Sequence, residues 1–195
     1  LMARSLDRAP TRAVNGRLRR LLPALWVFGA VLVPLMVWHG WSDRPAWPGL
    51  LTWLLPIAQP AGNAWAQDVT GVLWYLVTYL WLVLLSPALL GLYRRWPLPT
   101  VLLPLAAVVV LQTTSPPLSG QVNSVVTDLA TFGACWLVGF AHRDGALHRV
   151  PLAALLAAAA LCLGVGVGWT LTHPAGGFDL NDIPLAQAFY SLGFV

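Results

Sequence analysis

Residues 17–26 read Arg-Leu-Arg-Arg-Leu-Leu-Pro-Ala-Leu-Trp, so that an arginine cluster runs directly into an apolar segment. This junction predicts a membrane boundary, because arginine stays in water or among headgroups and tryptophan favours headgroup depth. Pro23 is expected in the first turn of a helix, where its missing N–H costs no hydrogen bond. Arg17 and Arg20 are three residues apart, so their guanidinium groups should emerge on one helix face at the water surface.

The composition predicts the class of protein. Hydrophobic residues make up 58% of the 195 residues and charged residues only 9%, with eleven tryptophans. Such a chain has too little polar surface for a soluble domain, and we expect an all-α, polytopic transmembrane bundle. Residues 1–195 are predicted to form a single membrane domain. Cys135 and Cys162 both lie in apolar runs, and we expect them to be packing residues.

Five apolar runs are long enough to cross a bilayer or nearly so, at residues 21–38, 72–93, 98–112, 121–141 and 150–171. A sixth run opens at Ile183 and is cut off at Val195; because the chain also begins at Leu1, we expect an internal fragment of a larger domain.

Two segments between or before these runs are also informative. Residues 1–20 are arginine-rich and interrupted by proline, so they should stay outside the membrane as a basic cytoplasmic segment. Residues 39–71 form a predicted extracytoplasmic loop whose apolar piece, 50–57, is too short to span. This piece should lie in the interface or re-enter as a half-helix, with the tryptophans of the loop at headgroup depth.

The loops on the two sides of the predicted membrane differ in their number of arginines. Ten lie on the N-terminal side, namely Arg4, Arg8, Arg12, Arg17, Arg19, Arg20, Arg94, Arg95, Arg143 and Arg149. Only Arg44 lies on the opposite side. Since cytoplasmic loops carry the excess of basic residues, the N-terminus is predicted to be cytoplasmic. The chain contains no lysine and no glutamate, which suggests a GC-rich bacterial genome and a place in the bacterial plasma membrane.

Few residues could carry chemistry. The arginine cluster could simply anchor the helix end, or Arg17 and Arg20 could clamp a phosphate through the planar fork of donors that arginine offers. Asp128 lies within an apolar run, where a carboxylate is costly. It could form a polar acceptor pocket or support a catalytic base, or it could be a hydrated aspartate near the outer interface.

The other polar residues lie in predicted loops. The predicted extracytoplasmic loop at 172–182 holds Asp179, Asn181 and Asp182, which would cap a following helix or dock a hydroxyl-rich acceptor. The four histidines, His39, His142, His148 and His173, fall outside the spans and are expected to be solvated. His142 and His148 share a cytoplasmic loop that could help to hold an anion. No zinc spacing or phosphate-cradling glycine loop occurs.

A resemblance narrows these alternatives. Residues 17–26, then Leu-Trp-Tyr-Leu-Val-Thr-Tyr-Leu at 73–80, Ser86-Pro87, and Asp-Leu-Ala-Thr-Phe-Gly-Ala-Cys-Trp at 128–136 with Gly139-Phe140 follow one another in order. This series resembles the membrane-bound acyltransferase-3 family and covers most of the chain. In that family two arginines separated by two residues are thought to engage the phosphates of coenzyme A. They match Arg17 and Arg20.

The resemblance implies transfer of an acyl group from cytoplasmic acyl-CoA to a hydroxyl or amine of a sugar, glycan or lipid-linked acceptor. Acyl-CoA would be a substrate, with no tightly bound cofactor, no metal and no nucleic-acid partner. The family's proposed catalytic histidine would lie upstream of residue 1, so the catalytic residue stays unknown, with Asp128 a weak candidate. Glutamates that many members carry after the Leu-Trp pair are absent here, where Thr78-Tyr79-Leu80 stands. A transporter or lipid-handling protein is the alternative.

Overall fold

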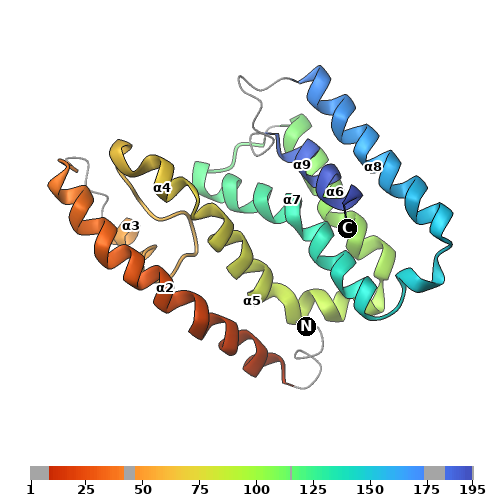
Figure 1. The fold of residues 1–195 in the computed structure, drawn as a ribbon, viewed down its shortest axis with the longest axis horizontal. Coiled ribbons are helices and arrows are strands. Elements are labelled where there is room, and N and C mark those ends of the chain that lie inside the picture. Colours follow the sequence, from red (N-terminus) through yellow and green to blue (C-terminus); the bar gives the residue numbers. More distant parts are fainter. Residues whose placement is uncertain (1–8, 42–46, 115, 174–182, 195) are drawn as a thin grey trace. The chain divides into compact units, whose positions relative to one another are not determined.

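The structure is a computed structural model that describes residues 9–41, 47–114, 116–173 and 183–194. Within these ranges every regular element is a helix. In chain order they are α2 (Pro10–Trp38), α3 (Trp47–Leu51), η1 (Ala64–Ala66), α4 (Gln67–Gly71), α5 (Trp74–Arg95), α6 (Pro97–Thr114), α7 (Gly120–Arg143), η2 (Leu147–Arg149), α8 (Leu152–Thr172) and α9 (Pro184–Gly193) (Figure 1).

Five of these helices, α2, α5, α6, α7 and α8, are long and apolar enough to cross a membrane. This finding confirms the predicted all-α, polytopic architecture, because only helices that satisfy their own backbone groups can cross hydrocarbon in this way. The sixth predicted span corresponds to α9, which begins at Pro184 and has ten residues. Which end of the chain faces the cytoplasm stays a prediction.

The helix that carries the arginine cluster is longer than predicted. It begins at Pro10, which occupies its first turn, and continues unbroken to Trp38 with Pro23 and Pro34 in its interior. The expectation that Pro23 opens the helix is therefore wrong. Residues 10–22 are mostly arginine, leucine and alanine, which are good helix formers. At 1.5 Å per residue the helix is about 43 Å long, more than a hydrocarbon core of about 30 Å, so part of it must project beyond the core.

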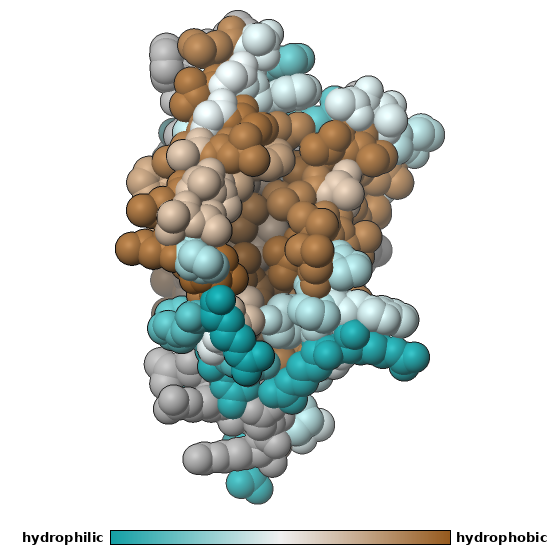
Figure 2. All heavy atoms as spheres, turned by 90° about the vertical axis from the view of Figure 1, so that its right-hand side faces the viewer, coloured by the Kyte–Doolittle hydropathy of each residue, from teal (hydrophilic) through white to brown (hydrophobic). Residues whose placement is uncertain are grey.

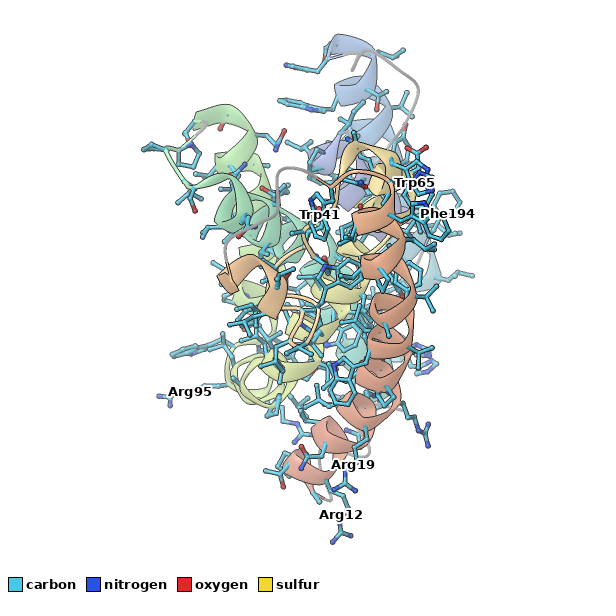
Figure 3. The ribbon with its side chains drawn as sticks, turned by 90° about the vertical axis from the view of Figure 1, so that its left-hand side faces the viewer. Arg12, Arg19, Trp41, Trp65, Arg95 and Phe194 are labelled. Carbon is cyan, nitrogen blue, oxygen red and sulfur yellow. The ribbon has the colours of Figure 1, made fainter. Side chains whose placement is uncertain are left out.

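The described chain divides into two compact units, Leu1–Ser86 and Pro87–Val195. The core of the first unit joins α2 to the segment that follows it. Its buried members are Leu25, Leu32, Met36, Trp41, Trp53 and Ala66. Trp41 and Trp53 are each only 5% exposed, so their rings contact protein rather than lipid headgroups. Figure 3 shows Trp41 and Trp65 at the end of the unit opposite to Arg12 and Arg19.

The irregular segment between α3 and η1 is fastened by tryptophan side chains. Three indole N–H groups donate to its backbone carbonyl oxygens, from Trp26 to Leu54 (2.9 Å), from Trp81 to Ile57 (2.9 Å) and from Trp53 to Ala61 (3.0 Å). Backbone carbonyls outside a helix need such partners wherever water is scarce. The donors come from α2, from α5 and from the segment itself, so these two long helices hold this stretch in place.

A glycine in α2 lets the segment approach closely. A Cβ atom on Gly29 would lie 2.9 Å from Cε3 of Trp53, which is too close for two carbon atoms. Gly29 lies nine residues before the end of α2 at Trp38, or about 14 Å along the helix axis. The segment thus runs beside the body of α2 rather than over its end. This packing is what a re-entrant segment requires, although its depth in a membrane stays a prediction.

The second unit contains α6, α7, α8 and α9 around a small core of Val108, Ala130, Leu185 and Ala188. In α8, a Cβ on Gly166 would lie 3.3 Å from the carbonyl oxygen of Ala186, so this glycine permits close contact with α9. Figure 2 shows hydrophobic side chains in a band over the face that carries α8, with hydrophilic residues gathered below it.

Candidate functional site

Arg17, the first of the two predicted clamp residues, contacts the opposite helix of its unit. Its Nη1 group donates a hydrogen bond to the hydroxyl oxygen of Tyr79 in α5. The guanidinium carbon lies 5.9 Å from the centre of the Tyr79 ring. Both side chains are half-buried. The charge of Arg17 is therefore drawn away from open water and held against an aromatic side chain.

Tyr79 is itself supported by other aromatic residues of α5. Its ring stacks on that of Tyr75, with centroids 6.4 Å apart and 25° between the planes. The Tyr75 ring in turn meets Trp74 edge-on, at 6.0 Å and 87°. Thr78 is buried, and its hydroxyl bonds the carbonyl oxygen of Trp74 one turn earlier. The motif at 73–80 thus supplies the surface against which Arg17 rests.

Arg20 differs from Arg17 in its surroundings. Three residues of helix rotate a side chain by about 300°, so the two arginines are neighbours on α2. Arg20 is exposed, as are Arg12 and Arg19, whereas Arg17 is partly covered. Arg20 is therefore the more accessible of the two, and a position of both guanidinium groups at the water surface stays a prediction.

A phosphate site at Arg17 and Arg20 stays a prediction, but the chemistry of the two side chains suits it. A guanidinium group carries five N–H donors, and Tyr79 accepts from one nitrogen of Arg17. The remaining donors of Arg17 and all those of Arg20 suit the oxygens of a phosphate, which arginine grips in a bidentate manner. Because Tyr79 restrains Arg17, less side-chain freedom would be lost when a phosphate binds.

Asp128 lies in α7, in the second unit. It is half-buried and stands beside Thr127, which is 8% exposed. One turn further on, Thr131 is 2% exposed and bonds the Thr127 carbonyl. These three residues form a polar patch in an apolar stretch of α7, a helix that also carries Gln121, Asn123 and Ser124 near its start. Whether Asp128 serves the reaction stays a prediction.

The remaining predicted polar residues are placed as follows. His39 stacks on Trp65 and His173 on Trp169, with ring centroids 4.1 and 3.9 Å apart. Asp179, Asn181 and Asp182, like Arg4, Arg8 and Arg44, lie outside the described residues. Within the described ranges no three histidine, cysteine, aspartate or glutamate residues come close enough to hold a metal ion.

Tyr79 is the residue whose role sequence reasoning missed. A tyrosine inside an apolar span buries its ring but needs a hydrogen-bond partner for its hydroxyl group. That need was visible in the sequence, but the partner, 62 residues earlier in the chain, was not.

The fold defines a multi-pass, all-α membrane protein, and the candidate site is a pair of arginines in the N-terminal half of α2. A protein-family model of the acyltransferase-3 family, described as an acyltransferase domain, matches residues 1–195. The chain therefore belongs to the acyltransferase-3 family, as the motif series predicted. No curated protein and no solved structure gives a significant match to it.

Proposed function

We propose that this membrane acyltransferase takes its acyl group from cytoplasmic acyl-CoA and transfers it to a hydroxyl or amine group of a sugar, glycan or lipid-linked acceptor. The observation that carries the proposal is the contact of Arg17 with Tyr79, which joins two of the motif segments that resemble the family. Arg17 and Arg20 would bind phosphates of the donor, and Tyr79 would position Arg17. The site would lie at the cytoplasmic surface of the bacterial plasma membrane.

The reaction needs little from these arginines beyond placement. The acceptor oxygen attacks the thioester carbonyl carbon, the carbon–sulfur bond breaks, and the sulfur leaves as the thiolate of coenzyme A. A base must remove the proton of the acceptor hydroxyl; by family resemblance this base would be a histidine. Two arginines that fix the donor phosphates make the attack effectively unimolecular, which can lower the barrier by several kcal/mol.

Fewer observations support the proposed residue for acceptor binding. Asp128 and its neighbouring threonines offer hydroxyl and carboxylate groups within α7 that could hydrogen-bond an acceptor hydroxyl. A carboxylate within a membrane helix is costly unless it is paired or hydrated, which favours a position facing the protein interior. We therefore retain Asp128 as the candidate residue for acceptor binding or for support of the base.

The test separates the geometry of the two guanidinium groups from their charge. Arg17→Lys combined with Arg20→Lys keeps both charges, so the topology should survive. The bidentate forks are lost, and acyl-CoA should bind about 1 to 3 kcal/mol more weakly. This corresponds to a dissociation constant about five- to a hundredfold higher. The measurement is acyl-CoA affinity of the intact protein in nanodiscs at fixed ionic strength, because salt screens exposed charges.

The matched control is Arg12→Lys combined with Arg19→Lys. Both of these arginines lie in α2 and are exposed, and neither contacts Tyr79. This variant should bind acyl-CoA as the parent does. If the Arg17/Arg20 variant also binds like the parent, the cluster is an anchor for the helix end and the proposed donor site is wrong.

A further inference from the structure

A second group of basic side chains gathers at one end of the second unit, where α5 and α7 end. We call it the basic rim and define it as Arg94, Arg95, His142, Arg143, Asp144, His148 and Arg149. Four arginines stand against one aspartate, so its net charge is +3 when both histidines are neutral. The proposed acyl transfer uses none of these residues.

A single aspartate ties the two helix ends of the rim together. The carboxylate of Asp144 lies 3.2 Å from Nη1 of Arg143 and 3.7 Å from Nε of Arg94. Gly145 follows with a φ of +74°, a conformation that glycine adopts without strain. Its N–H bonds the carbonyl oxygen of His142, which closes the turn at the end of α7. The rim is thus a tight, crosslinked turn rather than a loose loop.

Several of its side chains point outward from this turn. Arg149 and His148 are exposed, and the His148 ring lies 5.6 Å from that of His142, which is exposed as well. Arg95 is exposed, with its guanidinium carbon 4.8 Å from the centre of the Trp96 ring. Figure 3 shows Arg95 directed away from the helices. The rim therefore offers planar, charged donors to a ligand outside the protein.

Large apolar side chains adjoin these charges in the sequence. Trp96 is 52% exposed and Leu98 is 68% exposed, directly after Arg95. Val150 and Leu152 are 39% and 70% exposed, directly after Arg149. A site for a small soluble anion would not need exposed apolar residues next to its arginines. A molecule with a phosphate and attached acyl chains would use both parts, because arginines bind the phosphate and the apolar residues contact the chains.

We propose that the basic rim binds the phosphate of an anionic phospholipid, with the acyl chains of this lipid lying against Trp96, Leu98, Val150 and Leu152. The lipid would hold the ends of α5 and α7 at the membrane surface. This role does not depend on acyl transfer, so it can fail or succeed independently of the donor site at Arg17 and Arg20. A zwitterionic lipid with the same chains should bind less well, because its headgroup carries no net charge.

The test uses the intact protein in detergent, with native mass spectrometry to count retained lipids after titration with phosphatidylglycerol or phosphatidylcholine of matched chains. The parent should retain phosphatidylglycerol in preference to phosphatidylcholine. Arg95→Gln combined with Arg149→Gln removes two outward charges and spares the pairs with Asp144. It should weaken phosphatidylglycerol binding about thirtyfold, from the usual contribution of each basic residue at a membrane surface.

Two controls make the outcome decisive. Arg12→Gln combined with Arg19→Gln removes the same charge from exposed positions of α2 and should leave this binding unchanged. An equal loss in both variants would mean diffuse attraction and no site. The second control is acyl-CoA binding to the rim variant, which should match the parent. If acyl-CoA binding falls while lipid retention does not, the rim belongs to the donor site and the lipid proposal is wrong.

Discussion

Tyr79→Phe is the sharpest perturbation that the first unit offers, because it removes one oxygen atom and leaves the ring. The lost atom accepts the hydrogen bond from Nη1 of Arg17, while the stacking of the ring on Tyr75 should persist. Arg17 would keep its charge and its place on α2. What it would lose is the partner that restrains its guanidinium group.

The expected effect follows from that restraint. Ordering a long side chain on binding costs about 0.5 to 1.5 kcal/mol, and in the parent Tyr79 has already ordered Arg17. The dissociation constant of acyl-CoA should therefore rise about two- to twelvefold in Tyr79→Phe. This is less than the change expected for loss of the arginine forks, because the donors to the phosphate are still present.

The assay is acyl-CoA binding to the intact protein in nanodiscs, with Tyr75→Phe as the matched control. Tyr75 lies one turn away on the same helix and is 62% exposed, and its ring stacks on that of Tyr79. Tyr75→Phe should bind donor as the parent does. A double-mutant cycle with Arg17→Lys should be non-additive, since the two residues act through one contact.

Two results would refute this reasoning. Unchanged affinity in Tyr79→Phe would mean that the contact does not prepare Arg17 for a phosphate. Tighter binding would mean that Tyr79 competes with the donor for Arg17, which reverses its proposed role.

Two further predictions concern packing and topology. Gly29→Ala places a methyl group against a buried tryptophan ring and should cost about 1 to 3 kcal/mol of stability through overpacking. Gly91→Ala, with nothing within 4 Å of the added Cβ, should instead gain about 0.5 to 1 kcal/mol. Denaturation of both variants in the same detergent measures the difference, and equal stabilities would contradict the packing of the segment beside α2. In a background with both native cysteines replaced by serine, a cysteine at the exposed position Ser119 should react with a membrane-impermeant thiol reagent added outside and one at His148 should not. Labelling of both from the same side would contradict the predicted topology.

The class of protein and its family could both be predicted from the amino-acid sequence. Long apolar runs with few charges leave only membrane helices as a solution, because each backbone N–H and C=O must bond within its own segment. The order of the motifs along the chain was enough to indicate the acyltransferase-3 family, which the match over residues 1–195 confirms. Both conclusions depend on local pattern and linear order, and neither requires knowing which helix contacts which.

The start of α2 shows a prediction from local sequence that was wrong. Pro23 suits a first turn, and so does Pro10; only the continuous helix from Pro10 shows which one opens it. The many arginines before Pro23 suggested an irregular, water-exposed segment, but arginine and leucine form helices well whether or not the helix lies in lipid. Polarity therefore predicts a membrane boundary, but it does not locate the start of the helix.

The partners of the polar and aromatic side chains depend on how the helices pack, and they could not be predicted from the sequence. Spacing predicted that Arg17 and Arg20 are neighbours on α2, but the pairing of Arg17 with Tyr79 depends on how α5 packs against α2. The same holds for Trp26, whose indole N–H binds the Leu54 carbonyl, and for Gly29, where Trp53 leaves no room for a Cβ. These contacts join residues far apart in the chain, and their energies depend on close packing that no periodicity encodes.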